Sequence, residues 1–223
     1  MLLDRTPEQI LATLIALGIG MTLHEYAHNY VGWRMGDPEP ARQGRLTLNP
    51  LVHINWVGWL MFILIGFGFL GAAPISPYRM PRENRRWRWL AAVAAGPVSN
   101  LLVAVLVMLV IRILGMGFVG ELPDVVNLIL AYLMYFNVIL FIFNLLPLFP
   151  IDGWNILYAL LPPNLAEQWH KYQSTTQLIF FGVLLLTFVQ LPGIPNIGQV
   201  LFVEPARSIL RAGLGNLLYL FYF

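Results

Sequence analysis

Residues 24–28 read His-Glu-Tyr-Ala-His, and they lie toward the end of an apolar stretch that runs from Pro7 to Val31. A membrane-spanning helix needs about 20 predominantly apolar residues, so this stretch is long enough to cross a bilayer. On a helix, residues four apart lie on one face, with Cβ atoms about 5–6 Å apart. The imidazoles of His24 and His28 can therefore reach one metal ion, at ligand distances of about 2.0–2.1 Å.

Glu25 directly follows the first of these histidines and completes an H-E-x-x-H arrangement. In that arrangement the glutamate lies close to the metal without ligating it and accepts a proton from metal-bound water. Ionisable side chains inside a membrane-spanning helix are costly, and they indicate a functional site by default. A divalent cation would stabilise such a group. The alternative is a pair of histidines that hydrogen-bond to neighbouring helices or lie at the membrane surface.

The composition is that of a membrane protein. Of 223 residues, 58% are hydrophobic and 11% are charged, whereas soluble domains have about 45–50% apolar and about 25% charged residues. So few charged groups cannot cover a soluble surface. The chain has no cysteine, so a metal ion must be held by His, Asp or Glu, a set that suits zinc. The formal charge of +2 is small and the arginines lie beside apolar segments, which indicates a lipid bilayer rather than nucleic acid as the partner.

Several later stretches are also apolar and predict further membrane helices. We expect an all-α polytopic membrane protein with roughly four to six membrane helices or segments. Residues 1–223 would form one integral-membrane domain, with a core at 8–161 and C-terminal helices at 174–223. The last apolar stretch contains charged residues and predicts either an interfacial helix or a terminal anchor. The apolar stretches after Val31 cover residues 56–73, 89–114, 125–148, 154–161, 175–191 and 200–223.

A third metal ligand is expected at Asp152. Catalytic zinc takes three protein ligands and keeps one position open. Residues 144–153 read Asn-Leu-Leu-Pro-Leu-Phe-Pro-Ile-Asp-Gly. The two prolines end the preceding helix, and a carboxylate after such a break can point into the bundle. The alternative is that Asp152 caps the following helix at 154–161. Because the two histidines need a third partner, we favour ligation of one Zn2+ ion.

Three motifs, taken in order, resemble those of the site-2 protease family of intramembrane zinc metalloproteases. They are residues 24–28, the Gly-Pro-Val-Ser-Asn stretch at 96–100, and residues 144–153. The resemblance covers the greater part of the chain. Residues 45–55 are similar to a segment of the compact bacterial branch, which lacks regulatory domains, although that branch often has Asp at the position of Asn55.

The resemblance implies a function and roles for individual residues. It implies hydrolysis of peptide bonds in or near transmembrane segments of membrane-protein substrates, in a bacterial cell membrane. The zinc ligands that it implies are His24, His28 and Asp152. Glu25 would be the general base for zinc-bound water, and Asn100 and Asn144 would be polar groups near the scissile peptide. The alternative function is that of a membrane zinc-binding or zinc-transport protein without proteolytic activity.

Three other polar residues have open roles at this stage. A side-chain amide of Asn144 or Asn100 could stabilise the oxyanion of peptide hydrolysis, and for Asn144 we favour this catalytic role. Asn100 could instead form a hydrogen bond between helices. His53 could line the entrance to the site, bind substrate, orient a metal ligand from behind, or lie on the surface.

The metal ligands constrain the topology of residues 56–73. If this segment crossed the bilayer, Asp152 would lie on the opposite side of the membrane from the histidines. We therefore predict a re-entrant or extended segment between the first and second spans, with an extended edge near residues 72–77 that a substrate strand could join. Nine of the thirteen Lys and Arg then share one side, which the positive-inside rule makes cytoplasmic, and the site lies toward that face. These nine are Arg34, Arg42, Arg45, Arg79, Arg82, Arg85, Arg86, Arg88 and Lys171.

Overall fold

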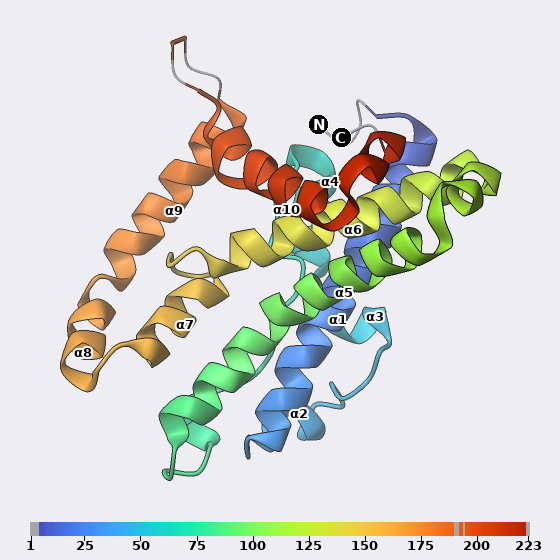
Figure 1. The fold of residues 1–223 in the computed structure, drawn as a ribbon. Helices are drawn as coiled ribbons and strands as arrows, with labels where there is room; N and C mark the ends of the chain where they lie inside the picture. Colours follow the sequence, from blue (N-terminus) through green and yellow to red (C-terminus); the bar gives the residue numbers. More distant parts are fainter. Residues whose placement is uncertain (1–4, 190–191, 194, 222–223) are drawn as a thin grey trace.

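The computed structural model describes residues 5–189, 192–193 and 195–221. Long helices dominate it and pack against one another (Figure 1). The expected domain and its C-terminal helices include residues 1–4, 190–191, 194 and 222–223, which lie outside the described residues.

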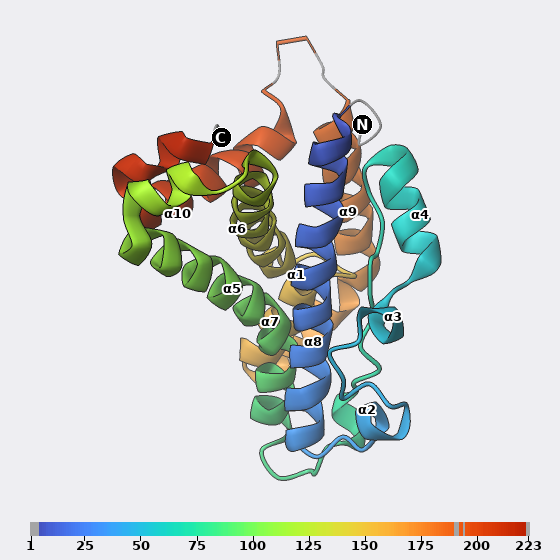
Figure 2. The same ribbon diagram turned by 90° about the vertical axis from the view of Figure 1, so that its right-hand side faces the viewer.

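Three of the described helices are long and apolar enough to cross a membrane: α1 (Pro7–Arg34), α5 (Arg85–Glu121) and α6 (Asp124–Leu145). The apolar span of α5 ends at Gly115, which takes a non-helical backbone with φ of 73°. α1 begins with a capping box, in which the side chains of Thr6 and Gln9 each accept from the other's backbone N–H. The chain descends along α1, rises along α5 and descends again along α6 (Figure 2).

The segment between α1 and α5 turns back on itself. Its short helices are α2 (Glu39–Arg42), α3 (Pro50–His53), α4 (Trp56–Ile65) and a 3-10 turn at Pro77–Arg79. The 10 residues of α4 are too few to cross a bilayer. Gly66 ends α4 in the left-handed region, with φ of 81°. An extended stretch then runs back beside α1 (Figure 2), and an antiparallel bridge joins Ile54 to Gly71. The predicted re-entrant or extended region is therefore confirmed.

The chain after α6 forms shorter helices. They are α7 (Asp152–Leu160), α8 (Pro163–Lys171), α9 (Gln173–Phe188), a π-helical turn at Gln199–Val203, α10 (Glu204–Leu214) and a 3-10 stretch at Gly215–Phe221. The expected span at 175–191 is the apolar helix α9, whose 16 residues fall short of the ~20 that a straight crossing needs. Leu210 and Leu214 of α10 belong to one buried cluster with Met108 of α5 and Met134 of α6. α10 therefore packs across the α5–α6 pair.

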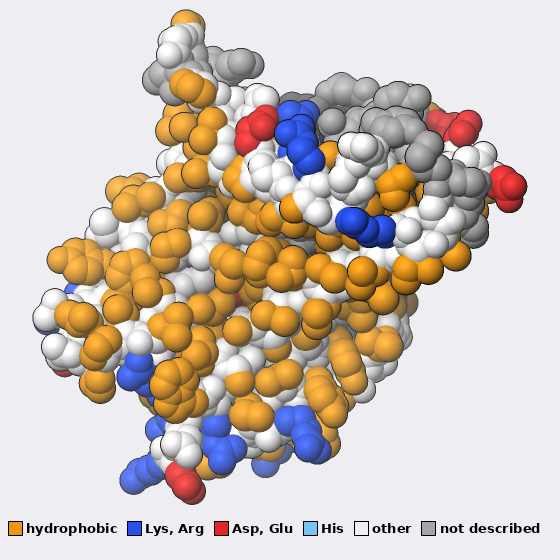
Figure 3. Space-filling view, in the orientation of Figure 1, with side chains coloured by type: hydrophobic (Ala, Val, Ile, Leu, Met, Phe, Trp, Pro, Cys, Tyr) orange, Lys and Arg blue, Asp and Glu red, His pale blue; other side chains and the backbone are white. Residues whose placement is uncertain are grey.

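Large apolar side chains are exposed along the long helices. Leu102, Leu106 and Ile113 of α5 are 62%, 63% and 80% exposed, and Leu178 of α9 is 74% exposed. Water disfavours so extensive an apolar surface, whereas lipid chains solvate it as well as a protein interior does. Lys and Arg gather instead at the end of the molecule where α5 begins (Figure 3). The chain is therefore a helical membrane protein, as its composition predicts.

Candidate metal centre

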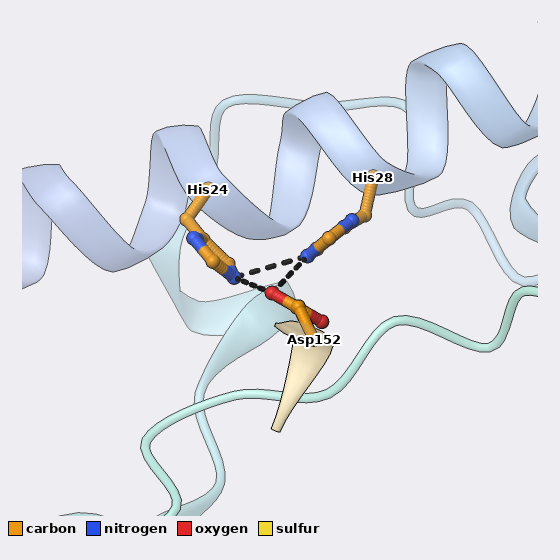
Figure 4. A group of neighbouring side chains, drawn as sticks. All are labelled: His24, His28 and Asp152. Atoms are coloured by element: carbon orange, nitrogen blue, oxygen red, sulfur yellow. Dashed lines mark hydrogen bonds and ion pairs between the residues drawn. The ribbon is translucent and has the colours of Figure 1, made fainter. Parts of the chain in front are cut away.

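Three side chains converge between α1 and the start of α7 (Figure 4). Nε2 of His28 lies 3.0 Å from Nε2 of His24 and 3.1 Å from Oδ2 of Asp152. Nε2 of His24 lies 3.2 Å from the same carboxylate oxygen. Both histidines are 4% exposed. The structure thus brings together the three residues that the sequence predicts as metal ligands.

The end of α6 and the start of α7 set the position of Asp152. α7 begins at Asp152 itself, and its N-cap residue is Ile151. Among the described residues, the hydrogen-bond partner of the Asp152 side chain is His28 rather than a backbone N–H of this helix. Its Oδ2 faces the two histidines instead. At Gly153 an added Cβ would overlap the backbone of Leu145 and Leu146, so glycine allows α7 to start tightly against α6. The alternative of a helix-capping Asp152 is therefore not what the structure shows.

Hydrogen bonds behind each ring fix which histidine nitrogen is protonated. Nδ1 of His28 lies 2.8 Å from the carbonyl oxygen of Ala92. A carbonyl accepts but cannot donate, so this Nδ1 donates. Nδ1 of His24 lies 2.7 Å from the amide oxygen of Asn100 and donates in the same way. In neutral rings the two Nε2 atoms then have free lone pairs, and these point at the convergence.

A chain of amides holds Asn100 in the orientation that accepts from His24. Nδ2 of Asn100 donates to the carbonyl of Gly20 at 3.0 Å and to Oδ1 of Asn137 at 2.9 Å. Nδ2 of Asn137 donates in turn to the carbonyl of Leu133 at 2.8 Å. Both asparagines are fully buried, so their donors need these acceptors. Asn100 therefore contacts the candidate ligand His24 at the ring nitrogen that faces away from the convergence.

The convergence is electron-rich and suits a cation. Two imidazole nitrogens with free lone pairs and a carboxylate oxygen lie within 4.8 Å of one another. Because all three atoms carry negative partial or full charge, they repel one another at such distances. Two nitrogens and one oxygen form a donor set that catalytic zinc takes, with a fourth position open. The residues present therefore fit one zinc ion.

Glycines and one further asparagine complete the surroundings. A Cβ at Gly96 would overlap the ring of His28, and a Cβ at Gly71 would lie 2.7 Å from Oε1 of Glu25. Asn137 and Gly71 belong to none of the motifs, so the sequence motifs do not identify them as site residues. The feature of the sequence that marks Asn137 is its position as a polar residue inside an apolar span, where asparagine commonly forms hydrogen bonds between helices.

A cavity of about 510 Å³ opens beside the convergence and is lined by His24, His28 and Asp152. Glu25 also lines it and is 4% exposed, and its Oε2 has no hydrogen-bond partner among the described residues. The extended stretch at 68–73 forms another wall. Buried polar atoms in native proteins are nearly always paired. A molecule that donates a hydrogen bond from within the cavity would satisfy this oxygen.

Asn144 and His53 occupy different cavities. Asn144 lines the metal-centre cavity, and one of its two amide hydrogens is donated to the carbonyl of Leu140 at 3.0 Å. His53 lines a separate, largely apolar cavity between α1 and α4. It is 4% exposed, and its Nε2 lies 2.8 Å from the carbonyl oxygen of Thr47. His53 is therefore not a surface residue.

Known proteins match most of the chain, although no family model and no solved structure does. The chain is 32% identical over 216 residues to "Putative zinc metalloprotease YwhC" of Bacillus subtilis, which covers 93% of this chain and 90% of that protein. It is 28% identical over 181 residues to "Putative zinc metalloprotease Rip2" of Mycobacterium tuberculosis, which covers 77% of this chain and 64% of that protein. Together with YwhC and Rip2, the chain therefore belongs to the site-2 protease family.

Proposed function

We propose that this protein is an intramembrane zinc metalloprotease that hydrolyses peptide bonds in or near transmembrane segments of membrane proteins. Glu25 supports this most directly. It is a buried carboxylate that lines the cavity of the three candidate ligands, and one of its oxygens has no hydrogen-bond partner among the described residues. It lies on α1, a helix long and apolar enough to cross a membrane. The relatives YwhC and Rip2 are each named "Putative zinc metalloprotease".

In this proposal His24, His28 and Asp152 hold one zinc ion. When bound, zinc lowers the pKa of a water molecule and polarises the scissile carbonyl. Glu25 is the general base, which accepts a proton from the attacking water and returns it to the leaving amine. Because Glu25 is buried, its proton transfers are limited to molecules inside the cavity.

Three more polar residues are assigned supporting roles. Asn144 lines the cavity, and its remaining amide hydrogen can stabilise the oxyanion of the transition state. Asn100 accepts from Nδ1 of His24 and so keeps Nε2 of that ring free for the metal. His53 lines the neighbouring cavity together with Leu70 of the extended stretch. In this proposal it stabilises the extended stretch on the side away from the metal centre.

The extended stretch after α4 is proposed to bind the substrate backbone. The carbonyl of Leu70 accepts from the backbone N–H of Asn55 at 2.9 Å. The carbonyl of Ala72 accepts from Nη1 of Arg45 at 2.8 Å. Because extended backbone alternates its polar groups between two sides, the N–H and C=O of Gly71 face away from these partners. A substrate segment unwound into a strand could pair with them.

We propose a bacterial cell membrane as the location, with the metal centre toward the cytoplasmic face. The basic end of the molecule (Figure 3) would face the cytoplasm by the positive-inside rule. Residues 1–223 are proposed to act as one integral-membrane domain, since the candidate ligands come from both α1 and α7. Single cysteines introduced at Arg42 and Arg82, which are both exposed, should be labelled from the same side of sealed vesicles. Labelling from opposite sides would contradict this topology.

The test of function compares the wild type with Glu25→Gln. We expect Glu25→Gln to keep its zinc and to lose cleavage of a membrane-peptide substrate by about 100-fold or more. Glu8→Gln, at the exposed start of α1, is the matched control and should keep both. Equal cleavage by the wild type and Glu25→Gln would refute the proposal. A zinc transporter would instead move zinc across vesicles, with little change in Glu25→Gln.

A further inference from the structure

A third cavity, of about 830 Å³, lies between the start of α5 and helices α7 and α8. We call it the basic–aromatic cavity. Trp89 and Asn155 line both this cavity and the metal-centre cavity. Asn155 lies one helical turn after Asp152 on α7. The two cavities are therefore neighbours that share a wall of side chains.

The basic–aromatic cavity has an excess of positive charge. Its lining includes Arg82, Arg85, Arg86 and Glu167. Arg85 donates to the carbonyl of Met80. Arg86 donates to the carbonyls of Ala159 and Leu160. These neutral acceptors leave the charges uncompensated, and the ion pairs among the described residues involve other groups. The cavity therefore favours an anion.

Aromatic rings form much of the remaining wall. Trp154 and Tyr158 stack with ring centroids 5.9 Å apart, and the ring of His170 meets both edge-on. Trp154 is 6% exposed, and its Nε1–H has no acceptor among the described residues. A buried indole N–H normally finds a partner. Trp154 lines the same cavity as the arginines, so a free N–H on this ring would add to the recognition of an anion there.

We propose that the basic–aromatic cavity binds the phosphate headgroup of an anionic membrane lipid. Basic pockets between membrane helices are the usual sites for such headgroups, and aromatic rings gather at the same membrane depth. The cavity lies where the apolar span of α5 begins. Its lining also includes Pro77, Leu161 and Pro163. These groups suit the glycerol and first methylenes of a lipid, whereas a free phosphate ion would not use them.

A headgroup in this cavity would join α5 to α7. Arg86 already connects the two helices through the last carbonyls of α7. An anion between the arginines of α5 and the aromatic residues of α7 would add a second connection. Because α7 also presents Asp152 to the histidines, bound lipid would hold that helix in place.

The test measures lipid binding to the full chain purified in detergent. Native mass spectrometry counts the molecules of phosphatidylglycerol or phosphatidylcholine that stay bound. We expect phosphatidylglycerol to be retained preferentially, and Arg82→Gln to weaken its binding by about fivefold, the effect of one charge near a membrane surface. Arg82 is exposed, so the fold should tolerate the change. Trp154→Phe keeps an aromatic ring at this position, removes the N–H donor and should weaken binding by about two- to tenfold.

Arg42→Gln is the matched control, because Arg42 is 72% exposed on α2 and is not part of the cavity lining. It should bind phosphatidylglycerol like the wild type. Equal binding by the wild type and Arg82→Gln would overturn the proposal, as would equal retention of the two lipids. Inorganic phosphate should not displace the bound lipid, and displacement would assign the cavity to a free anion instead. These readouts need neither zinc nor cleavage, so they are independent of the proposed protease function.

Discussion

The amide oxygen of Asn100 on α5 lies 2.7 Å from Nδ1 of His24 on α1, although the two residues are 76 positions apart in sequence. Asn100 is itself held by bonds to Gly20 and Asn137. His24 can therefore neither rotate nor change tautomer without breaking a buried hydrogen bond. The three longest helices thus meet behind one candidate metal ligand.

Asn100→Ala is expected to weaken zinc binding by about 10–100-fold, the usual effect of removing a partner behind a metal ligand. Titration against a chromophoric chelator measures this affinity. Asn127→Ala is the matched control, because Asn127 on α6 donates to the carbonyls of Val119 and Leu122, away from the histidines. An unchanged zinc affinity in Asn100→Ala would show that His24 does not depend on this bond.

Gly96→Ala should also weaken zinc binding. The added methyl group would overlap the ring of His28, and overpacking of this kind costs about 1–3 kcal/mol. We expect the ring to shift, and the zinc content after purification to fall. Gly182→Ala on α9 is the control, since its Cβ would have nothing within 4 Å. Full zinc content and affinity in Gly96→Ala would contradict this prediction, because they would show that the ring of His28 can shift away from the new methyl group and still bind zinc.

The sequence alone predicts the parts of this protein that depend on apolar length and on residue type. Three of the long apolar stretches are long helices, and the spacing of His24 and His28 places both on one helix face. The reversal of residues 56–73 also follows, because Asp152 cannot otherwise reach the histidines.

The sequence cannot predict which faces of distant helices pack together. Asn100 lies in a motif that points to the scissile peptide, yet its amide contacts His24. His53 lies in a polar stretch and is nevertheless buried beside α4. Asn137 belongs to no motif, and its importance follows from its contact with Asn100. Each of these positions is set by how α1, α5 and α6 cross, which a linear pattern does not contain.

Zinc should stabilise the fold through the residues of the metal centre. A ligand that binds the native state alone stabilises it by about 2.7 kcal/mol at 100 times its dissociation constant. We expect added zinc to raise the thermal midpoint in detergent and a chelator to lower it. Asp152→Asn should lose most of this effect, whereas Glu25→Gln should keep it, because Glu25 is proposed to act as the base and not as a ligand. The same zinc response in Asp152→Asn and the wild type would argue against ligation by Asp152.

A second buried carboxylate lies at the basic end of the molecule, outside the long helices. Asp37 is fully buried and accepts from Nε and Nη2 of Arg79 at 2.7 and 2.9 Å. The backbone N–H groups of Glu39 and Ser76 donate to it as well. Burial raises the pKa of Asp37, but these hydrogen bonds outweigh it and hold the pKa below its usual range. The ion pair between Asp37 and Arg79 links the segment that precedes α5 to the chain just after α1.

Asp37→Asn should therefore destabilise the protein by about 1.5–3 kcal/mol at neutral pH, the usual contribution of hydrogen bonds to a charged group. Because the folded pKa is below the unfolded value of about 3.9, this contribution is complete above that value and is lost as the pH falls through the folded pKa. Unfolding of the wild type and Asp37→Asn in mild detergent, across a pH series, measures it. Glu83→Gln, at an exposed position of the same end, should show no such difference. A gap in stability between wild type and Asp37→Asn that stayed constant on acidification would mean that the shape of the Asp37 side chain, rather than its charge, fastens this segment.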